Sequence, residues 1–312
     1  MSAHVAVIDI GGNSIKVLVA ERGLLGQVRG VFARTIDARI SAGISHAHPR
    51  LSDESMARGL AAIRELLTDA SRFTPASVVL VATSAVRDAL NGREFRDSVR
   101  NATGYDIRIL TGDEEADLIG RGLTCDPALA TLRNFYVFDL GGGSLECLAF
   151  LDRRVLQATS LRLGCVRLTE KFLADVSQPL LPEISTSIAE HTRTTLASAP
   201  FIFSLPPNAA AIGTGGTITT VRAIFAAKAG VPLESTSTEI KLDAIRALFV
   251  ELAALQLALR KTVPGLPPAR ADVFPTALAT LIAVAEAGAI TAYRHSFYNL
   301  RYGLAAEALG AE

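Results

Sequence analysis

The sequence has no excess of either charge. Its 312 residues contain 31 Lys and Arg and 31 Asp and Glu, so the formal net charge is zero. No global field therefore attracts nucleic acid, a membrane surface or a polyanion, and any anion that binds must be held by local groups. We expect neither nucleic acid nor a membrane among the partners.

Cysteine is scarce, and the three cysteines follow no recognisable pattern. Cys125, Cys147 and Cys165 show no CxxC spacing and do not form an even set. Both facts argue against a disulfide framework and against a structural zinc site. A reducing, cytoplasmic location fits this composition best.

Long apolar runs are also missing. The amino end has no basic segment followed by a long apolar run, and polar residues interrupt the first strand pattern, so we expect no signal peptide. The longest uncharged run near the carboxyl end, residues 274–285, is too short to span a bilayer and is followed by Glu286. It predicts a buried helix.

The sequence does contain a repeated glycine segment. Residues 9–14 read DIGGNS and residues 139–144 read DLGGGS, identical at four of six positions. Both copies lie between apolar strands, and 312 residues with 49% hydrophobic side chains exceed one ordinary core. We infer two similar α/β domains related by duplication, each presenting a hairpin turn toward a shared cleft.

Further periodic segments complete these domains. The first half predicts a helix over 52–72 capped by Ser52, a strand over 78–82, a helix over 93–102, a strand over 107–110 and a helix over 111–123. The second half predicts strands around 150–163, helices from about 166 and over 181–198, and a strand over 209–212. Residues 241–309 look helical, with breaks at prolines.

Three glycine-rich turns are candidate phosphate sites. Small consecutive residues let several backbone amides converge on one anion, because glycine tolerates the positive φ angles that side chains resist. The alternative is that such turns are ordinary hairpins chosen for their twist. The third turn, at 213–217, opens a helix. The candidate residues are Gly11, Gly12, Asn13, Ser14, Gly141, Gly142, Gly143, Ser144, Gly213, Thr214, Gly215 and Gly216.

Three acidic residues near these turns are candidate metal ligands. Asp9 and Asp139 each end a buried strand, where a carboxylate is costly unless it binds water, a cation or a donor. Glu146 lies two positions after Ser144 on the outgoing strand, so both side chains point to the same face. Oxygen ligands of this kind favour Mg²⁺ as the cofactor. The alternative for Glu146 is a solvated strand residue.

The segment from Thr111 contains a candidate general base. Thr111 followed three residues later by Glu114 predicts a capping box, which occupies Glu114 structurally. Glu115 comes one residue later, turned about 100° around the helix, and is the better candidate for a base. Alternatively, both carboxylates complement the helix dipole.

Arg87 follows the predicted strand over 78–82, at its carboxyl end. Such ends line clefts in α/β domains, and a guanidinium there can meet phosphate oxygens with forked geometry. Pairing with Asp88 or Asp113 is an equally good explanation for Arg87 from the residues alone.

Together these segments resemble a known family. Residues 9–14, 83–91, 110–116 and 138–146 look like the four successive signature segments of the Ppx/GppA family of exopolyphosphatases and guanosine pentaphosphatases, in matching order and spacing. Residues 163–170, 213–217 and 299–304 resemble later family segments, so the likeness covers nearly the whole chain.

The resemblance implies a fold and roles for the candidate residues. It implies an α/β chain of two ribonuclease-H-like domains of the actin-like ATPase superfamily with an interdomain cleft, formed by residues 1–124 plus about 303–312 and by 125–302. It implies that Glu115 matches the catalytic glutamate, Arg87 the phosphate-contacting arginine, and Asp139 and Glu146 the acidic residues near the metal. Two departures stand out: Gly12 replaces the usual serine, which removes one hydroxyl, and the chain resembles short members without additional helical domains.

The expected function is removal of the terminal phosphate from polyphosphate, with Mg²⁺ as cofactor and Glu115 as general base. The alternative within the family is hydrolysis of guanosine pentaphosphate, a stringent-response nucleotide. A kinase of the same superfamily and a non-catalytic nucleotide sensor are alternatives from other classes. The resemblance also leaves room for a homodimer.

Overall fold

The computed structural model describes residues 3–24, 26–45, 48–207 and 209–311, and it divides the chain into two compact units. Unit 1 comprises Met1–Thr131 and Tyr298–Glu312, and unit 2 comprises Leu132–Phe297. The boundaries between the two units therefore lie at 131/132 and 297/298. The family resemblance implies boundaries at 124/125 and about 302/303 instead. The short 3-10 helix η1 Pro127–Leu129, which packs against the helix before it in sequence, belongs to unit 1.

Unit 1 is built on a five-stranded sheet with the order β3-β2-β1-β4-β5. β1 pairs antiparallel with β2, β2 pairs antiparallel with β3, and β4 is parallel to both β1 and β5. The strands are β1 His4–Ile10, β2 Ile15–Arg22, β3 Val28–Ile36, β4 Ser77–Ala82 and β5 Ile107–Ile109. β1 is buried along almost its whole length because it is the central strand.

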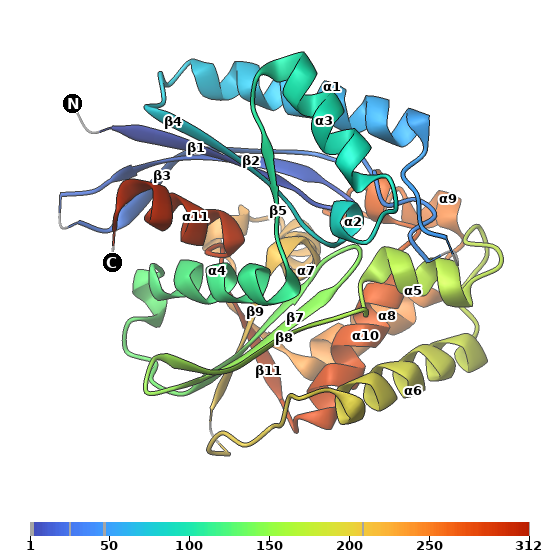
Figure 1. Cartoon of the computed structure of the whole chain (residues 1–312). Coiled ribbons are helices and arrows are strands. Elements are labelled where there is room, and N and C mark those ends of the chain that lie inside the picture. The colour runs from blue at the N-terminus through green and yellow to red at the C-terminus, as the bar shows by residue number, and fades with distance from the viewer. Residues whose placement is uncertain (1–2, 25, 46–47, 208, 312) are drawn as a thin grey trace. The chain divides into compact units, whose positions relative to one another are not determined.

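Helices cover both faces of this sheet (Figure 1). α1 packs against β1 and β2, and α11, which is far away in sequence, packs against α4 and the same two strands. The helices are α1 Asp53–Ser71, α2 Ser84–Arg87, α3 Gly92–Thr103, α4 Gly112–Thr124, η1 Pro127–Leu129 and α11 Leu300–Leu309. Ser52 caps α1 by accepting from the Ser55 amide, as the sequence predicts.

Unit 2 is built on a six-stranded sheet with the order β10-β11-β9-β6-β7-β8. β6 pairs antiparallel with β7, β7 pairs antiparallel with β8, and β9 is parallel to both β6 and β11. The strands are β6 Phe135–Leu140, β7 Leu145–Leu151, β8 Arg154–Leu161, β9 Ala210–Thr214, β10 Glu239–Lys241 and β11 Ala292–His295.

The helices of unit 2 pack on this sheet and on one another. α7 contacts β6 and β9, while α10 packs against α5, α6 and α8. The helices are α5 Cys165–Phe172, α6 Pro182–Ser198, α7 Gly215–Ala229, η2 Leu233–Ser235, α8 Leu242–Ala253, α9 Leu257–Arg260, η3 Pro268–Arg270 and α10 Phe274–Ala287. The uncharged run at 274–285 is the buried helix that was expected.

The two sheets share one topology, which confirms the fold class. Two antiparallel pairings followed by two parallel ones produce the order β3-β2-β1-β4-β5 in unit 1 and β8-β7-β6-β9-β11 in unit 2. The repeated glycine segment forms the first hairpin turn of each sheet. The chain is thus an α/β protein whose two units are built on mixed sheets of the same topology, as the duplicated glycine segment predicts.

One prediction for the carboxyl-terminal part is wrong. Residues 241–309 are not all helical, because β11 at Ala292–His295 forms the parallel neighbour of β9. Four residues are too few to show a strand period, and the buried Tyr293 makes this segment resemble helix core. In the part of the chain that the structure describes, no helix is long and apolar enough to cross a membrane, and Cys125, Cys147 and Cys165 are free thiols.

Candidate functional site

The β1–β2 turn of unit 1 is held from the side by the segment that follows β3. The Arg39 amide donates to the Asn13 carbonyl at 2.9 Å, and the Ser41 amide donates to the Gly12 carbonyl at 3.0 Å. Asp9, Asn13 and Ser14 are all buried, and Asp9 lies opposite Lys16 in the hairpin. The turn is therefore a rigid, polar and largely enclosed structure.

Arg87 and Glu115 come from helices that follow neighbouring parallel strands. α2 follows β4 and ends at Arg87, while α4 follows β5 and carries Glu115 in its first turns. The carboxyl ends of adjacent parallel strands lie at one edge of the sheet, so residues just after them converge. The topology alone thus brings together two side chains 28 positions apart in the sequence.

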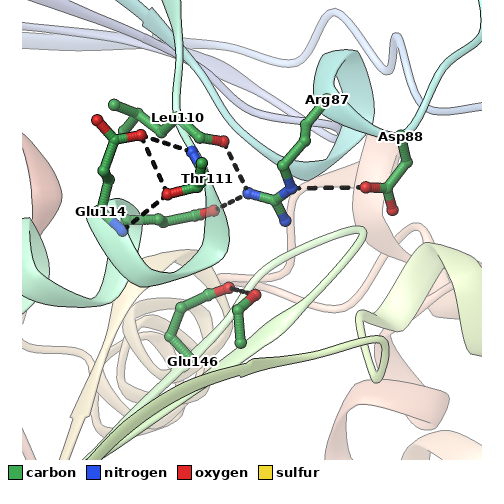
Figure 2. A network of polar contacts seen from close by, with 8 residues as sticks. Arg87, Asp88, Leu110, Thr111, Glu114 and Glu146 are labelled. Atoms are coloured by element: carbon green, nitrogen blue, oxygen red, sulfur yellow. Dashed lines mark hydrogen bonds and ion pairs between the residues drawn. The ribbon is translucent and has the colours of Figure 1, made fainter.

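The two side chains form an ion pair. Arg87 Nη1 donates to Glu115 Oε2 at 2.8 Å and to the Leu110 carbonyl at 3.2 Å, and Arg87 Nε lies 3.5 Å from Asp88 Oδ1 (Figure 2). The Glu115 side chain is only 7% exposed and the Arg87 side chain 22%. Pairing with Asp88 therefore accompanies the contact with Glu115. Glu115 thus faces Arg87 and not the cap that Glu114 occupies.

Glu114 has the structural role that the sequence predicts. The Thr111 hydroxyl accepts from the Glu114 amide at 3.2 Å, and the Glu114 carboxylate accepts from the Thr111 amide at 2.8 Å (Figure 2). The Thr111 amide and the Arg108 guanidinium lower the pKa of Glu114. This capping box fixes the start of α4 and so the position of Glu115 one residue later.

In unit 2, the equivalent turn at residues 141–144 rests on the start of α5. The Cys165 amide donates to the Gly141 carbonyl at 3.0 Å, and the Val166 amide donates to the Gly142 carbonyl at 2.9 Å. A Cβ on Gly164 would lie 2.3 Å from the Gly142 carbonyl oxygen, so only glycine fits there. Since the carbonyls face α5, the amides of Gly142 and Gly143 point away from it, and no acceptor for either occurs within the described ranges.

Asp139 and Glu146 lie side by side on one face of this sheet. They are directly opposite each other in the β6–β7 ladder, and Ser160 is opposite Glu146 on β8. Cross-strand neighbours of this kind have Cβ atoms about 4.5 to 5.5 Å apart. Glu146 is 2% exposed, and its Oε1 accepts from the Ser160 hydroxyl at 2.7 Å (Figure 2). Two adjacent carboxylates suit a hard divalent cation.

The third glycine-rich turn belongs to the same part of unit 2. Gly213 and Thr214 end β9, and Gly215 begins α7 with a φ of +80°, which favours glycine. A Cβ on Gly215 would lie 2.0 Å from Asp139 Oδ1, so the carboxylate of Asp139 rests against the amino end of α7. The predicted opening of a helix at this turn is confirmed.

Sequence reasoning missed Arg270. Its guanidinium lies over Gly216, where a Cβ would come within 2.4 Å of Nη1, and it donates to the hydroxyls of Thr217 and Thr220 at 3.3 and 3.2 Å. Arg270 is 8% exposed, and its Nε has no partner among the described residues. A buried cation beside a helix amino terminus attracts an anion. Arg270 lies in a proline-rich segment, and no local sequence pattern indicates a functional role for it.

The predicted site residues thus form one cluster in each unit. Arg87 and Glu115 lie together in unit 1, which also carries Asp9 and the first turn, and Asp139 and Glu146 lie together in unit 2 with the other two turns. Over the described ranges, no group of three or more His, Cys, Asp or Glu side chains has the geometry of a metal site. A cation here would therefore need water or substrate oxygens beside the two carboxylates, which is the usual coordination of Mg²⁺.

Comparison with known proteins gives the family and the fold of this chain. The model of the Ppx/GppA phosphatase family matches residues 22–312. The chain is similar to the crystal structure of an exopolyphosphatase-like protein, with 26% identity, 99% of each chain covered and a TM-score of 0.86. It shares its fold with an exopolyphosphatase from Cytophaga hutchinsonii at 21% identity and a TM-score of 0.84, and with an Aquifex aeolicus Ppx/GppA member at 23% and 0.78, each covering 99% of both chains.

Proposed function

Because the chain belongs to the Ppx/GppA phosphatase family, we propose that it hydrolyses the terminal phosphoanhydride bond of inorganic polyphosphate with Mg²⁺ as cofactor. The observation that carries the proposal is the ion pair between Arg87 and Glu115, a phosphate-binding group in direct contact with a buried carboxylate. The exopolyphosphatase-like relative and the exopolyphosphatase from Cytophaga hutchinsonii support polyphosphate as the substrate.

In this proposal Arg87 binds the terminal phosphate and Glu115 handles the attacking water. Phosphate oxygens that accept from Arg87 compete with Glu115 for the same guanidinium. Substrate binding therefore frees the carboxylate at the moment when it is needed. Glu115 then accepts a proton from water as the water oxygen bonds to phosphorus, and the bond to the bridging oxygen breaks.

Unit 2 carries its own set of candidate phosphate-binding groups. The amides of Gly142 and Gly143 and the buried guanidinium of Arg270 donate to phosphate oxygens, and such pre-positioned donors are the main source of catalysis in phosphoryl transfer. Asp139 and Glu146 would hold Mg²⁺, and a bound Mg²⁺ would supply positive charge to neutralise phosphate oxygens. The products are orthophosphate and a polyphosphate shorter by one unit.

A second candidate, hydrolysis of guanosine pentaphosphate, uses the same groups. The terminal phosphoanhydride of this nucleotide presents the same atoms to Arg87 and Glu115, and the family name includes both activities. The two candidates differ in what lies beyond the second phosphate. A kinase of the same superfamily would need an acceptor in place of water.

The test is phosphate release by the purified protein with Mg²⁺ and, in parallel, long polyphosphate, guanosine pentaphosphate and ATP. We expect release from polyphosphate to be fastest and release from ATP to be slow. Preference for guanosine pentaphosphate would select the second candidate. Phosphate transfer from ATP to an added sugar or acetate, without release from the other two, would contradict hydrolysis.

A further inference from the structure

The β1–β2 turn and the segment that lies against it contain three buried polar atoms that lack hydrogen-bond partners among the described residues. They are Asn13 Nδ2, Asn13 Oδ1 and Ser41 Oγ, and no described residue satisfies any of them. Asn13 is 6% exposed and Ser41 1%. A buried polar group without a partner typically costs about 1 to 3 kcal/mol, so native proteins keep such groups mainly where a ligand or water satisfies them.

Ser41 occupies the space that a side chain at position 12 would need. A Cβ on Gly12 would lie 2.8 Å from Ser41 Cβ and 2.9 Å from Ser41 Oγ. The backbone of Ser41 is fixed there, because its amide donates to the Gly12 carbonyl at 3.0 Å. A residue 29 positions later thus places a hydroxyl 2.9 Å from the point where a side chain at position 12 would begin.

Ser41 and the first turn adjoin the helix that ends at Arg87. A Cβ on Gly12 would also lie 3.3 Å from the Ala85 Cβ, and Ala85 is on α2, the helix that ends at Arg87. The crevice that Ser41 lines together with Ala85 and Ala89 is too narrow to admit a water molecule. On the side of the turn, Asn13 Nδ2 is a second buried donor without a partner among the described residues.

We propose that Ser41 is a phosphate-binding residue, whose hydroxyl donates to an oxygen of the terminal phosphate beside the Asn13 amide. The inference rests on the proposed function and deepens it, since it adds a hydroxyl donor from outside the glycine-rich turns. It also explains why position 12 is glycine: Ser41 and a side chain at position 12 exclude each other.

The first experiment compares Ser41→Ala with a matched control, Ser55→Ala. Both serines are 1% exposed and both are in unit 1, but the Ser55 hydroxyl is hydrogen-bonded to Ser52 Oγ and Arg58 Nη2. The probe is imidodiphosphate, in which nitrogen replaces the bridging oxygen, and its Kd is measured by calorimetry with Mg²⁺. KM for tripolyphosphate and the melting temperature are measured on the same proteins.

Ser41→Ala should raise Kd and KM roughly tenfold, the scale of one hydrogen bond to a charged group. Its melting temperature should stay the same or rise, because the substitution removes an unsatisfied buried hydroxyl. Ser55→Ala should do the reverse, with a lower melting temperature and unchanged Kd. A structural role for Ser41 predicts a lower melting temperature without a change in Kd, and that result would overturn the proposal.

The second experiment exchanges the two positions. Gly12→Ser alone should lower the melting temperature and weaken binding, because its side chain collides with Ser41. The double variant Gly12→Ser/Ser41→Gly should recover the wild-type Kd within about threefold, since one hydroxyl again occupies the shared space. A double variant that binds no better than Ser41→Gly alone contradicts the shared position.

These measurements separate the two proposals. If the wild type binds imidodiphosphate, and Ser41→Ala weakens the binding, but tripolyphosphate is not hydrolysed, the proposed function fails and the role of Ser41 stands. If the wild type hydrolyses tripolyphosphate and Ser41→Ala changes neither Kd nor KM, the role of Ser41 fails alone. If the wild type neither binds imidodiphosphate nor hydrolyses tripolyphosphate, both are wrong.

Discussion

Glu115 and its neighbour Glu114 have opposite roles, although they are adjacent and both acidic. Glu114 accepts from the Thr111 amide and pairs with Arg108, so it stabilises the start of α4. Glu115 points to Arg87 instead, because one step along a helix turns the side chain by about 100°. Substitutions at these two positions can therefore separate folding from turnover.

Glu115→Gln should retain the fold and lose most of the turnover. The glutamine side chain can still accept from Arg87, so the free energy of unfolding should fall by no more than about 2 kcal/mol. Loss of a general base typically costs ~100-fold to 10,000-fold in kcat, measured here as phosphate release. The matched control, Glu114→Gln, should lose stability and keep kcat within about threefold. Near-normal kcat in well-folded Glu115→Gln protein would defeat the assignment.

Asp139→Asn should change the dependence on Mg²⁺. The amide is the same size and still fits against Gly215, but it lacks the charge that a divalent cation requires. We expect the Mg²⁺ concentration for half-maximal activity to rise at least about tenfold. Asp152→Asn, an exposed carboxylate of unit 2 that pairs with Arg133, is the control and should leave it unchanged. Full activity of the wild type in a chelator would exclude Mg²⁺ from the mechanism.

At the scale of elements, the amino end of α7 depends on a buried network behind it. His295 ends β11 opposite Gly213, its Nε2 lies 3.0 Å from the Thr219 hydroxyl, and its Nδ1 lies 3.1 Å from Arg222 Nη1. Arg222 also donates to the Thr236 carbonyl at 2.8 Å. The third glycine-rich turn is thus supported by a strand and a helix whose polar groups satisfy one another.

This network predicts a loss of stability in mild acid. Burial, and then the neighbouring Arg222, lower the pKa of His295 to about 4, so the folded state binds the proton less well than the unfolded chain does. The contribution of His295 is fully present above about pH 6.5 and is lost as the pH falls toward 4, by up to about 3 kcal/mol. Urea unfolding of the wild type and His295→Gln between pH 7.5 and 4.5 measures this contribution. If the two profiles remain parallel, His295 is not the group responsible.

At the scale of the whole molecule, the formal net charge is zero, and the arginine-lined groove beside Arg87 adds little free positive charge. A groove of about 690 Å³ on unit 1 is lined by Arg87, Arg93, Arg96 and Arg108. Arg96 pairs with Asp106 through two hydrogen bonds, and Arg108 pairs with Glu114 and Glu307. Most of the positive charge in this groove is therefore neutralised.

We accordingly expect short polyphosphates to be used at least as efficiently as very long chains. Processive hydrolysis requires several cationic contacts that hold a polyanion between cleavages, and each paired arginine contributes little to such a hold. Gel analysis of a partial digest should show a ladder of intermediate lengths. Long polymer that coexists only with free phosphate and a short limit product would show processive hydrolysis and contradict this expectation.

The sequence by itself determined the features that depend on local chemistry. Each of these features depends on residues only a few positions apart in the sequence. They are the hairpin turns, the Ser52 cap, the capping box at Thr111 and the helix that begins at the third glycine-rich turn. The repeat at 9–14 and 139–144 also indicated two similar domains, because each copy of the glycine-rich segment lies between two apolar strand segments.

Only the tertiary structure decided which distant residues meet. Arg87 contacts Glu115 because β4 and β5 are parallel neighbours. Arg270 lies in a proline-rich segment without a recognisable pattern, and only the fold places it beside Gly216. β11 escaped prediction because four residues show no period, and its strand geometry comes from pairing with β9. The space beside Gly12 is filled by Ser41 for the same reason: packing depends on distances in the fold, which the order of residues along the chain does not contain.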